Sequence, residues 1–174
     1  DKNISLGHYL FLNKHEPYTY REIMNYPDKR LFIDVGANAG GYTIRAAKVF
    51  KKVVAIEPIP TYANIIRLNA KLNNLNNVIV YEYAVSDFIG EAKFYVKAFG
   101  QLSSLNEQPA DEVINVKVTT LEKIIDEIGE VPSLIKIDVE GTEVKVMKSL
   151  GKYISKVKEI IIESSEEGIK EILK

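Results

Sequence analysis

Asp34 and the glycines that follow it are the residues most suited to binding a ligand. The segment Asp34-Val-Gly-Ala-Asn-Ala-Gly-Gly41 directly follows the apolar run 31–33, and Glu57 ends the next apolar run. A strand that leads into a glycine-rich turn and then a helix presents backbone N–H groups to a ligand. An acid at the tip of the second strand is placed to bind a ribose diol. The pattern therefore predicts a nucleoside-cofactor site.

The spacing of this segment indicates which cofactor would bind. A dinucleotide fingerprint needs a glycine in the middle of the turn, where this chain has Asn38 between Gly36 and Gly40. Asp34 would also repel a pyrophosphate, whereas it suits a ligand that presents an ammonium group. S-adenosylmethionine carries such a group, together with a sulfonium and a ribose diol. We therefore expect S-adenosylmethionine on Asp34, Gly36, Asn38, Gly40 and Glu57, the alternative being a plain tight turn.

Asp138, Glu140 and Glu143 form a second group, suited to catalysis. Asp138 and Glu140 are two positions apart at the end of an apolar run, so both point to one side if the chain stays extended. In-line geometry supplies much of the rate of a methyl transfer, and a carboxylate can act as general base. We expect Asp138 near the sulfonium or acceptor, Glu140 as the base and Glu143 at the substrate. The alternatives are a solvated pair that caps the next helix and an Mg²⁺ or Ca²⁺ site.

Three further residues are expected near the substrate. Ser103 and Ser104 lie in the loop 97–111, and Glu163 ends the last apolar run. As simpler interpretations, the two serines form a turn and Glu163 is a polar strand terminus.

Strands and helices alternate along the chain and place these residues. A capping box, Thr119-x-x-Glu122, opens a helix that reaches Ile128, and Gly151 is expected to stop another helix. Strands are expected at 31–35, 53–57, 78–83, 92–96, 113–118, 134–139 and 159–163, and further helices at 42–50, 61–72, 143–150 and 166–173.

This order predicts an α/β fold with a doubly wound, mostly parallel sheet, in which 92–96 and 113–118 form an antiparallel pair. Ligands of such sheets bind at the carboxyl ends of the strands, near the point where the strand order reverses. Asp34, Glu57, Ala84 and Asp138 all fall at such ends.

The composition fits one globular domain. The chain has 174 residues, a net charge of −1 and no cysteine, which excludes thiolate chemistry and disulfides. We expect a cap segment at 1–30 and the catalytic domain at 31–174. No basic bias points to nucleic acid, and no apolar run is long enough for a membrane span. The expected location is cytoplasmic, although the chain begins with Asp1 and residues before it are not excluded.

Several segments resemble FkbM-type S-adenosylmethionine-dependent methyltransferases. The resemblance lies in residues 34–43, in Ile56-Glu-Pro-Ile-Pro60, in Asn77-Val-Ile-Val with Ala84-Val-Ser-Asp87, and in Lys136-Ile-Asp-Val-Glu-Gly-Thr-Glu143. It implies a Rossmann-like class I methyltransferase that modifies an oxygen of a small molecule or glycan. Carried over by position, Asp34 faces the methionine end, 36–40 form the cofactor turn, Glu57 holds the ribose, and Ala84, Ser86 and Asp87 border the adenine.

One departure from the family concerns the end of the sheet. The family has a further strand pair after the fifth strand, which this chain lacks, so it is either a trimmed version or part of a longer protein. An open edge invites pairing with another copy. The alternatives to O-methylation are RNA or protein methylation, a nicotinamide-dependent oxidoreductase, which Asn38 opposes, and a cofactor-binding domain without an acceptor pocket.

Overall fold

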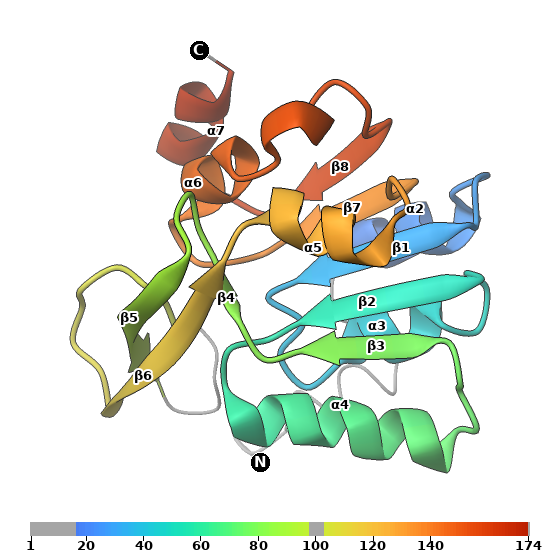
Figure 1. Ribbon diagram of the computed structural model, residues 1–174, viewed down its shortest axis with the longest axis horizontal. Helices are drawn as coiled ribbons and strands as arrows, with labels where there is room; N and C mark the ends of the chain where they lie inside the picture. The colour runs from blue at the N-terminus through green and yellow to red at the C-terminus, as the bar shows by residue number, and fades with distance from the viewer. Residues whose placement is uncertain (1–16, 98–102, 174) are drawn as a thin grey trace.

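A parallel sheet of five strands forms the centre of the molecule (Figure 1). The computed structural model describes residues 17–97 and 103–173; the remainder of the predicted cap segment and loop lies outside them. The strands are β1 (Leu31–Val35), β2 (Lys52–Ile56), β3 (Val78–Tyr81), β7 (Leu134–Ile137) and β8 (Glu159–Ile162), in the order β3-β2-β1-β7-β8. Every neighbouring pair is parallel. The strand order reverses between β1 and β7, as a doubly wound fold requires.

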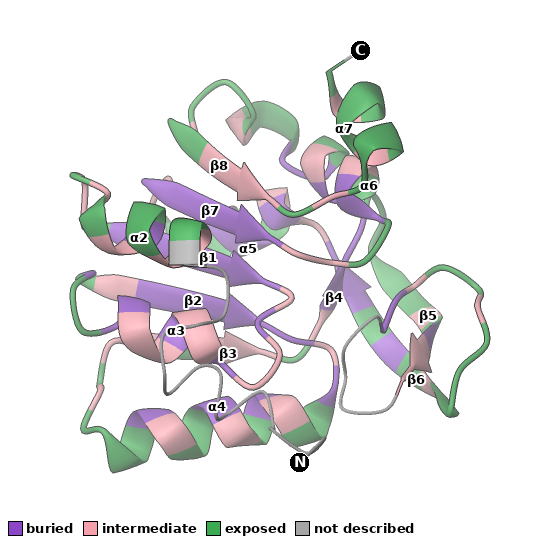
Figure 2. Cartoon of the chain, turned by 180° about the vertical axis from the view of Figure 1, so that it is seen from behind, coloured by how far each residue is buried: buried purple, intermediate pink, exposed green. Residues whose placement is uncertain are grey.

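Helices cover both faces of this sheet, which confirms the predicted fold class. One face packs against α2 (Pro17–Asn25), α3 (Gly41–Ala46) and α4 (Pro60–Leu72), through buried residues such as Ile23, Ala46 and Ile66. Figure 2 shows α2 and α3 in front of the strands. The other face packs against α5 (Leu121–Ile128) and α6 (Glu143–Lys148).

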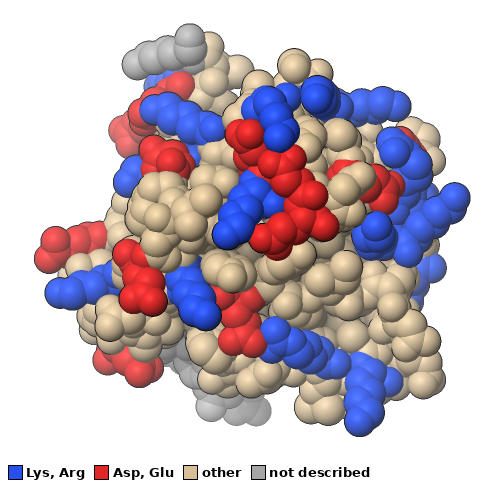
Figure 3. Space-filling view, viewed as in Figure 1, with Lys and Arg blue, Asp and Glu red and all other residues tan. Residues whose placement is uncertain are grey.

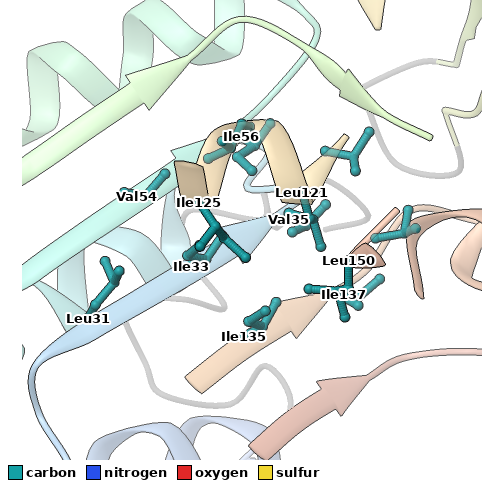
Figure 4. Packing of buried hydrophobic residues seen from close by; sticks show 13 residues of the cluster. Leu31, Ile33, Val35, Val54, Ile56, Leu121, Ile125, Ile135, Ile137 and Leu150 are labelled. Atoms are coloured by element: carbon teal, nitrogen blue, oxygen red, sulfur yellow. The ribbon is translucent and has the colours of Figure 1, made fainter. Parts of the chain in front are cut away.

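The largest core cluster lies on the α5 face (Figure 4). Alternate residues of β1, namely Leu31, Ile33 and Val35, point into it, while Phe32 points to the α3 face. Strands covered on both faces read as continuous apolar runs because neither side chain direction reaches water. Asp34 and Lys136 interrupt two such runs on the α3 face, and both are buried.

A second, smaller sheet follows β3. It consists of β4 (Ala84–Val85), β5 (Gly90–Val96) and β6 (Glu112–Thr119), in the order β4-β6-β5. The β5–β6 pair is antiparallel, as predicted. Phe94, Val116 and Val118 form its core with Ile59, which lies directly after β2. This contact holds the small sheet over the carboxyl end of the large one.

Several element ends differ from the predictions, each for a local reason. The helix expected at 42–50 ends at Ala46, because the chain then tightens into turns in which Val49 N–H donates to the carbonyl of Ala46. Thr119 belongs to β6, and its neighbour Thr120 caps α5 by accepting from Lys123 N–H. Gly151 does not stop α6, which ends at Lys148, but begins a short 3₁₀ turn, Gly151–Tyr153.

The sheet has edges at β3 and β8 in the described part of the chain. A last helix, α7 (Glu166–Ile172), follows β8 and lies beside α6 (Figure 1). No helix within residues 17–97 and 103–173 is both long and apolar enough to cross a lipid bilayer.

Candidate active site

A cavity of about 360 Å³ opens at the carboxyl ends of β1, β2 and β7. This is the point where the strand order reverses, which is where ligands of such sheets are expected to bind. The lining comes from the glycine turn after β1, from the residues after β2 and β7, from β4 and from the segment 103–105. Its size falls in the range of about 300 to 1,000 Å³ that is typical of small-molecule sites.

Gly36 is held between two strands and tolerates no side chain. Its φ is 76°, and a Cβ atom on it would overlap the carbonyl oxygen of Asp138 at the end of β7. Its N–H donates to the carbonyl of Ile56, at the end of β2. Gly40 also has a positive φ, 85°, and precedes the first turn of α3. The two glycines therefore allow the turn to pack closely against Asp138 and Ile66, beside the cavity.

Asn38 and Glu57 connect the glycine turn to the end of β2, and both line the cavity. Asn38 lies in the left-handed region with φ 50°, which asparagine tolerates better than most residues. The Glu57 carboxylate accepts hydrogen bonds from Asn38 N–H at 2.8 Å and from Ile59 N–H at 2.9 Å. Burial raises the pKa of Glu57 to about 7, although these two hydrogen bonds favour its ionised form. The loop thus places a buried carboxyl group on the lining.

Asp34 lies beneath the glycine turn, against α3. Its Oδ2 accepts a hydrogen bond from the Thr43 hydroxyl at 2.6 Å. Its Oδ1 is buried and has no hydrogen-bond partner among the described residues. Burial raises the pKa of Asp34, while the positive charge of Lys136 opposes that rise. Asp34 is absent from the cavity lining, so it lies behind the residues that would contact a ligand.

Lys136 lines the cavity, although the sequence analysis did not single it out. It lies beside Asp34 in the register of β1 and β7 and is 2% exposed. Its ammonium donates to Asp138 Oδ2 at 2.9 Å and lies 4.8 Å from the centre of the Tyr42 ring. A lysine inside the apolar strand Leu134–Ile137 was the available signal, because a buried ammonium requires partners.

The turn between β7 and α6 carries two residues in the left-handed region. Glu140 has φ 54° and Gly141 has φ 93°. Glu143 accepts from Gly141 N–H at 2.7 Å through Oε1, and from the Ser164 hydroxyl at 3.2 Å through Oε2. Glu143 is buried and outside the cavity lining, whereas Glu140 is exposed and lines the cavity. This placement argues against the expected contact of Glu143 with substrate and gives it a role in closing the turn.

The segment 103–106 alternates between the cavity and this turn. Ser103 and Leu105 line the cavity. The Ser104 hydroxyl instead donates to the carbonyl of Glu140 at 2.7 Å, and the Asn106 amide donates to the carbonyl of Gly141 at 2.9 Å. Ser103 therefore takes the place on the lining that was expected for Ser104.

The remaining predicted residues divide into two groups. Ala84 and Glu163 line the cavity. Ser86 and Asp87 do not: Ser86 is buried, and its hydroxyl donates to the exposed Asp87 at 3.2 Å. Residues 84–87, which the family resemblance places beside the adenine, begin as strand β4, because Val85 pairs with Thr119 of β6.

Among residues 17–97 and 103–173, no group of three or more acidic or histidine side chains could hold a metal ion. Asp138 pairs with Lys136, and Glu143 binds the turn, so the acids at 138, 140 and 143 do not converge.

A family model of the methyltransferase FkbM domain matches residues 34–174. Comparison with curated protein sequences finds no match.

Three solved structures have a similar fold. The first, a methyltransferase FkbM from Methylobacillus flagellatus KT, has 23% identity and a TM-score of 0.53 over 89% of this chain. The others are a precorrin-6y C5,15-methyltransferase from Geobacter metallireducens GS-15, with 15% identity and a TM-score of 0.52 over 89% of this chain, and an rRNA methylase from Streptococcus thermophilus, with 11% and 0.54 over 87%. This chain covers 42%, 65% and 73% of these structures, respectively.

Proposed function

The chain belongs to the FkbM methyltransferase family, as its motifs predicted, and we propose that it transfers a methyl group from S-adenosylmethionine to a hydroxyl oxygen of a small molecule or glycan. The observation that carries this proposal is the charge of the cavity. Among the described residues, four carboxyl groups line it, those of Glu57, Asp138, Glu140 and Glu163, against one ammonium, that of Lys136. Such a lining repels a pyrophosphate and attracts a ligand with a positive sulfonium.

The buried acids fit this cofactor. When bound, S-adenosylmethionine supplies an electrophilic methyl group on its sulfonium. Glu57, fixed by two backbone N–H groups, has lone pairs left to accept from ribose hydroxyls. We assign Asp34 to the support of the glycine turn, since it is buried against Thr43 and absent from the cavity lining. Ala84 borders the adenine in this assignment, whereas Ser86 and Asp87 support the turn that carries it.

The acids after β7 act on the acceptor. One oxygen of Asp138 is bound by Lys136, so we assign Asp138 to orienting the acceptor hydroxyl. Glu140 would take the hydroxyl proton as the acceptor oxygen bonds to the methyl carbon and the methyl–sulfur bond breaks, which leaves S-adenosylhomocysteine. A carboxylate in reach of the acceptor suffices for this step, since in-line positioning supplies most of the remaining rate.

The surface supports a small acceptor rather than RNA. On the face shown in Figure 3, acidic and basic side chains are intermixed at the centre and on the left, and basic side chains predominate along the right margin; the whole chain carries a net charge of −1. RNA recognition favours a continuous basic face. For partners, we also infer that two copies of the chain associate through the edge of β8 that pairs with no strand of the described residues.

Isothermal titration calorimetry with S-adenosylmethionine, S-adenosylhomocysteine and NAD tests the cofactor. We expect binding of the first two and none of NAD. Glu57→Gln should weaken binding about tenfold, the value of one charge-assisted hydrogen bond. The matched control is Glu82→Gln, which removes an exposed carboxylate paired with Arg67 and should bind as the wild type does. Binding of NAD alone would overturn the proposal.

A further inference from the structure

The turn at Glu140 and Gly141 has a strained backbone conformation that residues of another segment hold in place. A residue with a side chain costs about 1 kcal/mol or more in the left-handed region, and Glu140 adopts it with φ 54°. Such strain persists only where the surroundings fix the backbone. The question is therefore which residues fix this turn.

Two of the fixing groups come from the segment between β5 and β6. The Ser104 hydroxyl donates to the Glu140 carbonyl at 2.7 Å, and the Asn106 side-chain amide donates to the Gly141 carbonyl at 2.9 Å. Successive carbonyls of the turn thus each accept from a different side chain. The third group, the Glu143 carboxylate, binds Gly141 N–H within the same loop.

This segment is itself firmly attached. Ser104 is 2% exposed, and its backbone N–H and carbonyl both bond to Tyr95 of β5, at 3.1 and 2.9 Å. The Ser104 hydroxyl also accepts from the backbone N–H of Asn106 at 3.2 Å, which fixes the Asn106 backbone beside the turn. The anchor is therefore rigid, and it connects the small sheet to the acids after β7.

We propose that Ser104 and Asn106 are positioning residues, which hold the Glu140–Gly141 turn in its left-handed conformation so that Glu140 lines the cavity. The inference rests on the proposed function for the role of Glu140 as base. It also explains why the four residues 103–106 alternate: Ser103 and Leu105 border the cavity, and the two residues between and after them hold the turn.

NMR of the whole chain tests this inference. The readouts are the amide exchange rate of Gly141 and the ¹³Cα and ¹³Cβ shifts of Glu140, which report its backbone conformation. We expect Ser104→Ala and Asn106→Asp to accelerate Gly141 exchange about tenfold and to move the Glu140 shifts. Asn106 is exposed and Asn106→Asp is isosteric, so this variant folds even if Ser104→Ala does not. Ser104→Thr, which keeps the hydroxyl, should restore the wild-type values.

The matched control is Thr120→Ala, which removes one side chain-to-backbone hydrogen bond at the start of α5. It should leave Gly141 and Glu140 unchanged. The proposal is overturned if Asn106→Asp leaves both readouts at their wild-type values, or if Thr120→Ala moves them equally. A titration of the same samples with S-adenosylmethionine separates the two proposals: absence of binding to the wild type refutes the proposed function, while the exchange rates still decide the role of Ser104 and Asn106.

Discussion

Glu57 is a carboxyl group whose protonation is coupled to folding. Burial raises its pKa from an ordinary 4.5 to about 7. Between these values the folded state keeps the proton that the unfolded state has lost, so the free energy of unfolding falls as the pH rises. The contribution of this residue amounts to about 3 kcal/mol over the whole interval.

Glu57→Gln removes this titration. We expect the stability of the wild type relative to the variant to fall by about 3 kcal/mol between pH 4.5 and 7.5, as measured by urea denaturation at a series of pH values. Asp34 is present in both proteins, and its charge interaction with Glu57 is part of the measured difference. Parallel stability curves for the two proteins would show that Glu57 ionises in the folded state as it does in water.

Asp34 and Lys136 are buried neighbours in β1 and β7 that interact through their charges, while the hydrogen-bonded partner of Lys136 is Asp138. Lys136→Met leaves Asp34 buried without its nearby cation, and should cost roughly 3–5 kcal/mol. Because the charge is the cause, Asp34→Asn in the same chain should recover about 2 kcal/mol of that loss. Lys52→Met is the matched control: it removes a half-buried lysine of β2 paired with Glu130 and should cost below about 1 kcal/mol. Strict additivity of the Lys136 and Asp34 changes in chemical denaturation would contradict the pairing.

At the scale of elements, the central strands were predictable from the sequence, because strands that are buried on both faces appear as continuous apolar runs. The ends of the helices were less predictable. Thr119 and Thr120 are equally good caps, and only the pairing of Thr119 with Val85 across β4 and β6 assigns the cap to Thr120. The same limit applies to the site: Gly36 and Glu57 follow from local sequence, whereas the contacts of Ser104 depend on how the small sheet packs.

The contact between the glycine turn and β7 gives a test at this scale. Gly36 and Gly129 have similar positive φ values, 76° and 71°, but a Cβ on Gly129 would meet nothing within 4 Å. Gly129→Ala should therefore lower the free energy of unfolding only by the cost of placing an alanine in the left-handed region, about 1–2 kcal/mol. Gly36→Ala adds overlap with the Asp138 carbonyl, and should cost a further 1–3 kcal/mol or so.

Gly36→Ala should also weaken S-adenosylmethionine binding, because the turn and the end of β7 both border the cavity. Gly129→Ala should bind as the wild type does, which calorimetry on the two variants would show. Equal destabilisation of the two variants would mean that the turn moves away from β7 at no cost.

At the scale of the whole molecule, the proposed association of two copies can be tested at the edge of β8. Glu163 N–H donates to the carbonyl of Ile137, so the alternation of the strand turns Ile161 N–H toward β7 as well. The N–H groups of Ile160 and Ile162 then point away from the sheet. A twofold axis through this edge would pair two copies of β8 antiparallel, with these groups as donors.

Amide hydrogen exchange at several protein concentrations tests this association, and the strand contains its own control. Four residues a side form a short interface, so the dimer should be weak and the series should span roughly 10 µM to 1 mM. Protection of Ile160 and Ile162 should rise with concentration, in step with the mass measured by sedimentation. Ile161 and Glu163 bond to β7 in the monomer, so their protection should stay constant. Exchange at Ile160 and Ile162 that is independent of concentration, together with a monomer mass throughout, would rule out pairing through β8.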